Sequence, residues 1–358
     1  MCNQPHRHSI HCIVPPYMTD QLVRSSNPEI RDRALATLKI SAAFRAERKF
    51  AQSFPSLMVY ALSAEQGKNR LIYDARQTDN LMNTIVRKEG EPAGEDVAVN
   101  EAYDYSGDTY DFFEKLFQRN SLDDKGMTLI STVHVAESDY RGGYVPMSNA
   151  FWNGELMAYG DGDGIIFNRF TQSLDVVGHE LTHGVQSFTS NLNYYGQPGA
   201  LNEHFSDVFG ILIRQWKKQE SAATANWTIG SEVLVPAETR RGIRDMLNPG
   251  KAYVDDPDLG TDPQPGHMNN LYTGPYDNNG VHINSGIPNR VFALVATELG
   301  GNAWEVAGRI WYDTLLQLTS SSQFKDCARL TIQNAGSLFG EAEKKVVQNA
   351  WKTVGLTV

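Results

Sequence analysis

The chain of 358 residues is poor in cysteine and has no long apolar run. Its three cysteines, Cys2, Cys12 and Cys327, are too few and too scattered to form a disulfide framework. No apolar stretch approaches the length of about 20 residues that a membrane-spanning helix needs. The N-terminus is rich in His, Arg and Pro and lacks the apolar core of a secretory signal. These absences predict a fold held by its hydrophobic core, with no membrane segment and no export by the standard route.

The chain also has no excess of basic residues, and its net charge is −10. Residues 1–50, called the leader below, hold eight Lys or Arg against four Asp or Glu. The remaining chain, called the body, therefore has a net charge of −14. No basic stripe indicates a nucleic-acid partner. The basic leader either docks on the acidic body by electrostatic attraction or contains an ordinary solvated basic helix.

The leader is predicted to differ from the rest of the chain. Residues 1–14 contain three histidines and two cysteines at a spacing that fits no standard zinc module, which favours a flexible tail over a metal-binding one. Pro15-Pro16-Tyr17 indicates an extended segment. Asn27 and Pro28 are typical of a helix start, and this helix is expected to reach about Phe50. Residues 51–70 are expected to connect it to the body.

The body is predicted to have a β-rich half and a helical half. Residues 71–74, 97–99 and 128–135 have strand patterns, and residues 102–120 have a helical pattern of aromatic side chains. The Gly-Asp stretch at 159–164 matches no calcium-loop spacing and is expected to turn between strands. Residues 200–218, and those from Pro288 onward, are expected to be helical with breaks at Gly300-Gly301 and Gly340.

The segment between these halves carries the most informative motif, His179-Glu180-Leu181-Thr182-His183. Apolar residues recur around it at helical spacing, so both imidazoles leave one face of a helix. His-Glu-x-x-His supplies two zinc ligands and a glutamate that acts as general base on a bound water. The alternative is a core helix whose histidines only satisfy buried hydrogen bonds.

A catalytic zinc needs a third protein ligand. Glu203 and Asp207 lie one turn apart on the next predicted helix and face the same way. Glu203 is the candidate ligand, and Asp207 is the candidate acceptor for the N–H of a ligand imidazole. The alternative is a pair of solvated carboxylates.

These segments together resemble the thermolysin family of zinc metallopeptidases. The matching blocks are Asp175–Val185, Gly199–Asp207, Val281–Gly286, Asn149–Gly154 and the Gly-Asp turn. The resemblance covers residues 71–358, and the short leader with Pro15-Pro16-Tyr17-Met18 is similar to that of the protealysin-like branch. It implies an α+β fold of two domains joined by a central zinc-binding helix and preceded by a short helical propeptide. The expected domains are 1–60 (propeptide), 61–187 (β-rich) and 188–358 (mainly helical).

The resemblance also implies the residues of the active site. It implies His179, His183 and Glu203 as ligands of one zinc ion, with Glu180 as general base. His282 and Tyr194 would stabilise the oxyanion, and Asp277 would orient His282. Asp207 and Asn202 would hold His179 and His183, respectively.

Substrate-binding residues are implied in the same way. Asn149, Ala150 and Trp152 would pair with the substrate backbone, and Arg244 would grip its carbonyl on the leaving-group side. Phe167, Val176, Ile229 and Ile243 would line an apolar pocket, which predicts cleavage before bulky apolar residues. The family's paired calcium site is expected to be lost, because Arg214 occupies a position where a calcium ligand is expected.

The sequence therefore predicts a zinc-dependent neutral endopeptidase made as a self-processing precursor, acting on peptides or proteins. Its propeptide would inhibit it, with cleavage between Phe50 and Ala61. A monomer is expected, secreted by a non-classical route from a cytoplasmic precursor, with no nucleic-acid or membrane partner.

Two alternative functions are a non-catalytic zinc-binding or adhesion protein and a zinc hydrolase of non-peptide esters or amides. The intact set of Glu180, Tyr194 and His282 disfavours the first, and the implied peptide-binding edge disfavours the second. A leader thiolate on the zinc is a further possibility for Cys2 or Cys12.

Overall fold

The computed structural model describes residues 11–38, 67–138 and 142–358. Two compact units make up the chain. The sheet unit is Arg7–Val185 with Glu232–Val235, and the helical unit contains Gln186–Ser231 and Pro236–Val358. Among the described residues, no helix is long and apolar enough to cross a membrane.

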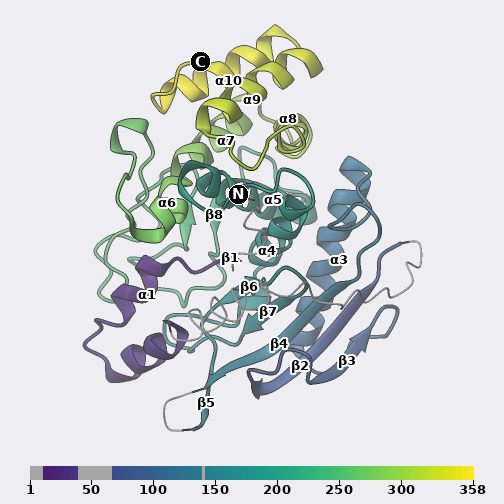
Figure 1. The fold of residues 1–358 in the computed structure, drawn as a ribbon, viewed down its shortest axis with the longest axis vertical. Helices are drawn as coiled ribbons and strands as arrows, with labels where there is room; N and C mark the ends of the chain where they lie inside the picture. Colours follow the sequence, from purple (N-terminus) through teal and green to yellow (C-terminus); the bar gives the residue numbers. More distant parts are fainter. Residues whose placement is uncertain (1–10, 39–66, 139–141) are drawn as a thin grey trace, which may run out of the picture. The chain divides into compact units, whose positions relative to one another are not determined.

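The sheet unit is built on a mixed seven-stranded sheet (Figure 1). The strand order is β1 (His11–Cys12), β6 (Ala150–Trp152), β7 (Met157–Gly160), β4 (Leu129–Ser138), β2 (Arg70–Thr78) and β3 (Thr84–Lys88), and β5 (Tyr144–Pro146) pairs with β4. β4 runs parallel to β2 and β7, and the other pairs are antiparallel. The predicted strands at 71–74 and 128–135 are confirmed. Their alternating apolar residues, such as Ile72 and Val133, are buried.

The helices of this unit are α1 (Pro16–Leu22), α3 (Val97–Phe117), η1 (Phe170–Gln172) and α4 (Leu174–Ser187), with a further helical stretch at residues 28–38. The predicted strand at 97–99 is wrong, because these residues form the first turn of α3. The Asp96 carboxylate caps that turn and accepts hydrogen bonds from the N–H groups of Ala98 and Val99. An apolar triplet alone does not distinguish a strand from a buried helix start.

The Gly-Asp stretch leaves β7 at Gly160 and leads to η1, so the expected turn between two strands is wrong. The Asp163 carboxylate accepts from the N–H groups of Ile165, Ile166 and Phe167 at 2.7–2.9 Å. This side-chain cap satisfies the N–H groups that follow the turn. Between the turn and η1, all of which the structure describes, the chain forms only an isolated antiparallel bridge, between Phe167 and Leu234, and no second strand.

The helical unit contains α5 (Gly196–Lys218), α6 (Tyr276–Asn284), α7 (Gly286–Leu299), α8 (Val306–Leu315), α9 (Phe324–Leu338) and α10 (Glu341–Thr353). It also contains η2 (Met268–Asn270) and a two-stranded ribbon of β8 (Thr228–Ile229) and β9 (Arg244–Asp245). The predicted helical character and its breaks are confirmed. Gly300, with φ +69°, ends α7, and Gly340, with φ +121°, precedes α10.

The leader corrects one expectation and supports another. Pro15 is extended, but Pro16 already begins α1, so the expected extended stretch through Tyr17 is wrong. A proline is favoured in a first helical turn because its missing N–H has no partner there. The helix expected after Asn27 starts as predicted, and the Asn27 side chain accepts from Glu29 N–H at 3.0 Å. Its expected end at Phe50, residues 51–66 of the connector and residues 1–10 of the tail lie outside the described residues. The expected flexible tail is wrong for residues 11–14, because His11–Cys12 form β1 and Ile13 and Val14 are buried.

Candidate metal centre

His179 and His183 lie on α4 in the sheet unit, one helical turn apart. Their Nε2 atoms are 3.0 Å apart, and both side chains are buried. The ring planes cross at 87°. Val177, Leu181 and Val185 are fully buried on the same helix, as the apolar pattern predicts. Two imidazole nitrogens aimed at one point are a donor set that suits zinc, which binds such nitrogens at about 2.0–2.1 Å.

Glu180, between the histidines, contacts the neighbouring strand β6. Its Oε2 accepts a hydrogen bond from the backbone N–H of Trp152 at 3.0 Å. Gly184, one turn further along, lets α4 approach this strand closely, because a Cβ there would lie 2.7 Å from Leu122 Cδ1 and 3.4 Å from the Trp152 ring. The strand that carries the predicted peptide-binding residues therefore also fixes the predicted general base.

The predicted peptide-binding edge carries a strand of the leader. β1 pairs antiparallel with β6, with His11 opposite Trp152 and Cys12 opposite Phe151. Ile13 N–H donates to the Ala150 carbonyl at 3.3 Å, and Val14 N–H donates to Asn149 Oδ1 at 3.2 Å. Main-chain pairing of this kind is how an extended peptide adds to a sheet edge.

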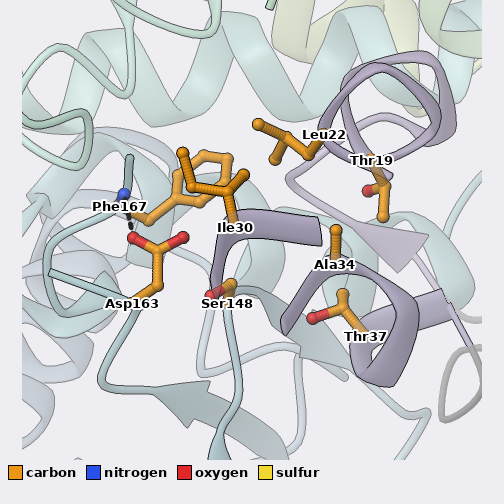
Figure 2. A pocket seen from close by; sticks show the side chains of 8 residues that line it. All are labelled: Thr19, Leu22, Ile30, Ala34, Thr37, Ser148, Asp163 and Phe167. Atoms are coloured by element: carbon orange, nitrogen blue, oxygen red, sulfur yellow. Dashed lines mark hydrogen bonds between the residues drawn. The ribbon is translucent and has the colours of Figure 1, made fainter. Parts of the chain in front are cut away.

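Phe167, one of the predicted pocket residues, lies under the leader helices. Figure 2 shows its ring beside Ile30 and Leu22 in a pocket between the leader and the body. The pocket is also lined by Thr19, Ala34, Thr37, Ser148 and Asp163. Arg33 Nη1 donates to the Asp163 carbonyl at 2.8 Å. Val176, predicted to line the same specificity pocket, is fully buried on α4.

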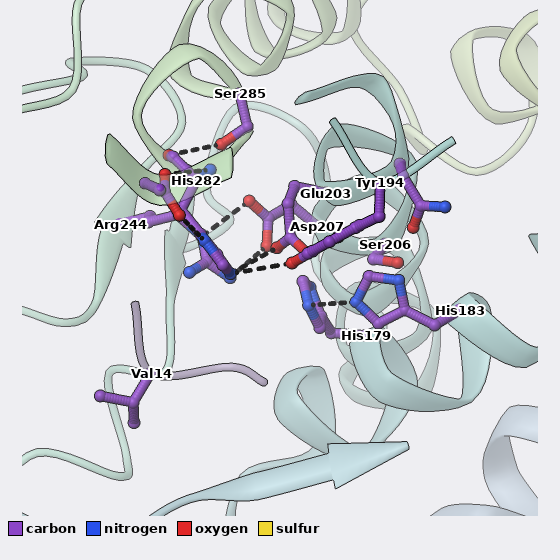
Figure 3. Close-up of polar contacts among 12 residues, drawn as sticks. Val14, His179, His183, Tyr194, Glu203, Ser206, Asp207, Arg244, His282 and Ser285 are labelled. Atoms are coloured by element: carbon purple, nitrogen blue, oxygen red, sulfur yellow. Dashed lines mark hydrogen bonds and ion pairs between the residues drawn. The ribbon is translucent and has the colours of Figure 1, made fainter. Parts of the chain in front are cut away.

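Glu203, Tyr194 and His282 come together in the helical unit. The Tyr194 hydroxyl donates to Glu203 Oε1 and lies 3.1 Å from His282 Nε2 (Figure 3). His282 Nε2 is 3.6 Å from Glu203 Oε2. The structure thus gathers three residues that are up to 88 positions apart in the chain.

Asp277 orients His282 through three hydrogen bonds. Its carboxylate lies 2.6 Å from His282 Nδ1 and accepts from the N–H groups of His282 and Ile283 at 2.7 and 3.1 Å. This contact depends on a left-handed turn, because φ is between +49° and +77° from Asp277 to Gly280. Burial opposes the charge on His282, but Glu203 and Asp277 outweigh it and raise its pKa to about 9.

Asp207 and Arg244 form a buried ion pair in the same unit. Arg244 donates through Nε and Nη2 to the two carboxylate oxygens at 2.8 and 2.7 Å, and both side chains are fully buried. Arg244 lies on β9, opposite Ile229 on β8. Ile229 and Ile243, the remaining predicted pocket residues, are also buried in this unit. Asn202 donates from Nδ2 to the Leu192 carbonyl at 3.3 Å.

Sequence analysis did not single out His204, Asn289 or Trp311. These fully buried side chains are hydrogen-bonded to one another, and Asn289 is bonded to Asp207. Burial lowers the pKa of His204 to about 4, so its ring is neutral. The available signal was His204 itself, a polar residue placed directly after Glu203.

Arg214 is buried at 2% exposure, and its guanidinium is bound by backbone carbonyls. Nη1 donates to the Thr228 carbonyl at 3.0 Å, and Nη2 donates to the Asn226 carbonyl. The positively charged guanidinium of Arg214 therefore already binds carbonyl oxygens, which are the kind of ligand that calcium prefers.

Comparisons with known protein families match both parts of the body. Residues 47–187 match the thermolysin metallopeptidase catalytic domain, and residues 190–356 match the thermolysin metallopeptidase alpha-helical domain. The chain belongs to the thermolysin family and is a peptide hydrolase, and this family is zinc-dependent. Its architecture, a sheet-containing catalytic part and a helical C-terminal part, is the two-domain fold of the family, as predicted.

Relatives of similar length support this assignment. An extracellular metalloprotease of Pectobacterium carotovorum subsp. carotovorum is 46% identical over 97% of this chain and 96% of its own length. Protease PrtS of Photorhabdus sp. (strain Az29) is 45% identical over 97% and 92%, respectively. The solved precursor of protealysin, a metalloproteinase from Serratia proteamaculans, is 44% identical, with a TM-score of 0.86 over 97% of this chain and all of that chain.

Proposed function

We propose that this protein is a zinc-dependent neutral endopeptidase made as a self-processing precursor. The observation that carries the proposal is the arrangement on α4 and β6: two buried imidazole nitrogens 3.0 Å apart, with Glu180 between them bound to the strand edge. The family membership supplies the reaction class. Cleavage before bulky apolar residues and the role of each side chain are part of the proposal.

One zinc ion would be held by His179, His183 and Glu203. Two neutral imidazoles and one carboxylate are a donor set typical of a catalytic zinc with an open position for water. When bound, such an ion lowers the pKa of water and polarises the scissile carbonyl. Asp207 and Asn202 would accept the hydrogen bonds that the remaining ring N–H groups of His179 and His183, respectively, donate, which would orient the two imidazoles.

Glu180 would act as the general base. The hydrogen bond from Trp152 N–H to Oε2 fixes the direction of the carboxylate, which would take the proton of the attacking water. Glu180 then returns this proton to the leaving amine. Tyr194 and protonated His282 would donate to the oxyanion, and Asp277 keeps the proton on His282 Nδ1.

The substrate would bind along β6 as the leader strand does, with its carbonyl held by Arg244. Phe167, Val176, Ile229 and Ile243 would form the pocket for the residue after the cut. An Ile243→Asp enzyme should lose its preference for apolar residues there, as measured by mass spectrometry of products from a peptide library. An unchanged preference would remove Ile243 from the pocket.

Residues 1–60 would be a propeptide that blocks the enzyme, followed by catalytic domains 61–187 and 188–358. The support is β1, which occupies the proposed substrate edge in a backbone-paired form. Cleavage would fall between Phe50 and Ala61. The protein would act on peptides or proteins outside the cell, because two relatives that match nearly the whole chain are proteases and one of them is named as extracellular. It would act as a monomer. Export by a non-classical route from a cytoplasmic precursor is the corresponding prediction.

Paired calcium binding would be absent. The Arg214 guanidinium already binds the Thr228 and Asn226 carbonyls, and its charge repels a second cation. Calcium should therefore leave the melting temperature unchanged within about 2 °C, because a ligand that does not bind the native state does not stabilise it. A large rise on calcium titration would contradict this.

The deciding experiment follows wild type and Glu180→Ala by mass spectrometry during incubation, with a casein assay alongside. Wild type should shed about its first sixty residues and gain activity that a zinc chelator removes. The Glu180→Ala protein should stay whole and inert while binding zinc equally. If both stay whole and inert with zinc bound, the rival reading as a zinc-binding protein is favoured.

A further inference from the structure

A buried chain of hydrogen bonds crosses three helices of the helical unit and ends at Arg244. Trp311 Nε1 on α8 donates to His204 Nε2 on α5 at 2.7 Å. His204 Nδ1 lies 2.8 Å from Asn289 Oδ1 on α7, and Asn289 Nδ2 donates to Asp207 Oδ2 at 2.8 Å. Every member, including Asp207 and Arg244, is fully buried.

The direction of this chain follows from the chemistry of its first member. An indole N–H can only donate, so His204 Nε2 must accept and carries no proton. The proton of the neutral ring is then on Nδ1, which donates to the carbonyl oxygen of Asn289. The Asn289 amide is thereby turned so that its NH₂ group faces Asp207.

Asp207 accepts the last hydrogen bond of this chain and also binds Arg244. Its Oδ2 accepts from both Asn289 Nδ2 and Arg244 Nε, and its Oδ1 accepts from Arg244 Nη2 (Figure 3). A reversed Asn289 amide would place a carbonyl oxygen against the carboxylate, which would weaken the alignment of Arg244. The tautomer of His204 therefore decides which group of the Asn289 amide faces Asp207.

We propose that His204, held in its Nδ1–H form by Trp311, is a positioning residue that acts through Asn289 and Asp207 to orient Arg244 toward the substrate carbonyl. The inference rests on the proposed function of Arg244 in substrate binding. It deepens that function, because it assigns a role in substrate binding to Trp311, His204 and Asn289, which act through Asp207 and Arg244.

The alternative is that His204 only fills the core. Its ring centroid lies 5.1 Å from that of Phe205 and 6.3 Å from that of Trp311, in edge-on geometry. Packing depends on the ring as a whole, whereas positioning depends on the donor at Nδ1. Two amide substitutions separate these roles, since both remove the ring.

The test compares His204→Asn with His204→Gln. The amide nitrogen of Asn takes the place of Nδ1 and can still donate to Asn289, whereas the amide of Gln reaches the Nε2 position and serves Trp311. KM and kcat are measured on processed enzyme with a peptide that has leucine after the scissile bond, together with zinc content and melting temperature. His204→Gln should raise KM roughly tenfold with kcat within about twofold, and His204→Asn should keep KM within about threefold of wild type. Equal KM changes in both variants, in step with their melting temperatures, would overturn the proposal.

A second measurement needs no core substitution. In the Glu180→Ala precursor labelled with ¹⁵N-histidine, His204 should show a protonated Nδ1 and an unprotonated Nε2, assigned by the signals lost in His204→Asn. A protonated Nε2 would reverse the chain and overturn the proposal. If wild type lacks peptidase activity while this tautomer is found, the proposed function fails and the hydrogen-bond chain stands, so the two failures are distinguishable.

Discussion

At the scale of single residues, two buried guanidinium groups in the described part of the chain show what a buried charge requires. Arg244 is paired with Asp207, and Arg214 is bound by two backbone carbonyls. An unpartnered buried charge would cost several kcal/mol, which explains why each guanidinium has its acceptors in place. The sequence indicated that Arg214 would occupy a cation site but not that it would be buried.

Replacement of Arg214 should destabilise the protein. Arg214→Leu leaves the buried carbonyl of Thr228 and the carbonyl of Asn226 without their donor, which should lower the free energy of unfolding by about 2–4 kcal/mol. The matched control is Arg309→Leu, because Arg309 is 44% exposed and pairs with Asp313 at helical spacing. That change should cost less than about 0.5 kcal/mol. Urea unfolding in the Glu180→Ala background measures both, and equal costs would contradict the assignment.

His134 should make stability depend on pH. Its Nδ1 lies 2.9 Å from both Asp161 oxygens and its Nε2 lies 2.8 Å from Asp96 Oδ2. The hydrogen bond to Asp161 raises the pKa of His134 to about 9 despite partial burial, and Asp96 adds to the rise. Because the folded-state pKa is above the unfolded value, this stabilisation is complete below pH about 6.5 and is lost as pH rises through about 9.

The corresponding variant is His134→Asn, since asparagine tolerates the left-handed backbone of this position, where φ is +54°. It should be less stable than its parent by about 1–2 kcal/mol at pH 6, and the difference should shrink at pH 10. Denaturant unfolding at both pH values, again in the Glu180→Ala background, measures the effect. A difference independent of pH would show that His134 acts by packing alone.

At the scale of elements, β1 shows how the leader is attached to the body. Ile13, Val14, Met18 and Leu22 are buried, so apolar contacts accompany the main-chain pairing with β6. Among the described leader residues, the charged contacts with the body include that of Arg33 with the Asp163 carbonyl. The basic composition of the leader is thus less informative about its docking than its apolar side chains.

A charge in β1 should therefore release the leader. Ile13 is fully buried, so Ile13→Asp would bury a carboxylate beside the strand pair. In the Glu180→Ala precursor, trypsin should then cut the leader at least about tenfold faster, because the open form becomes more populated. Gln21→Asp is the control, since Gln21 is exposed on α1 and carries the same new charge. Equal cleavage rates for both variants would show that β1 does not hold the leader.

At the scale of the whole molecule, each unit has its own hydrophobic core. Buried residues such as Ile72, Phe113 and Val133 fill the sheet unit, and Phe205, Trp311 and Trp351 fill the helical unit. Cores of this size supply folding free energy without a metal ion. Zinc is consequently expected to serve catalysis more than folding.

Removal of zinc should inactivate the processed enzyme without unfolding it. A chelator should abolish casein hydrolysis and leave the far-ultraviolet circular dichroism at 20 °C unchanged, and added zinc should restore activity. The melting temperature should fall, because a ligand present at about 1,000 times its Kd contributes about 4 kcal/mol. Loss of helical signal on chelation would show that zinc is structural.

The sequence by itself determined the family, the two-part architecture and the α4 motif, because local periodicity and spacing decide which side chains share a helix face. It also gave the breaks at Gly300 and Gly340, where backbone geometry favours glycine. It failed at Val97–Val99 and at Pro16-Tyr17, where a capping carboxylate and a proline-led helix start outweighed a local pattern.

Only the tertiary structure decided those distant contacts for which the sequence held no motif. The resemblance had already linked Tyr194 with His282, 88 positions apart, but nothing in the sequence linked Trp311 with His204, 107 positions apart. The pairing of β1 with β6 is equally non-local. Such contacts leave no periodic signal, because they depend on how whole elements pack and not on the spacing of residues within one element.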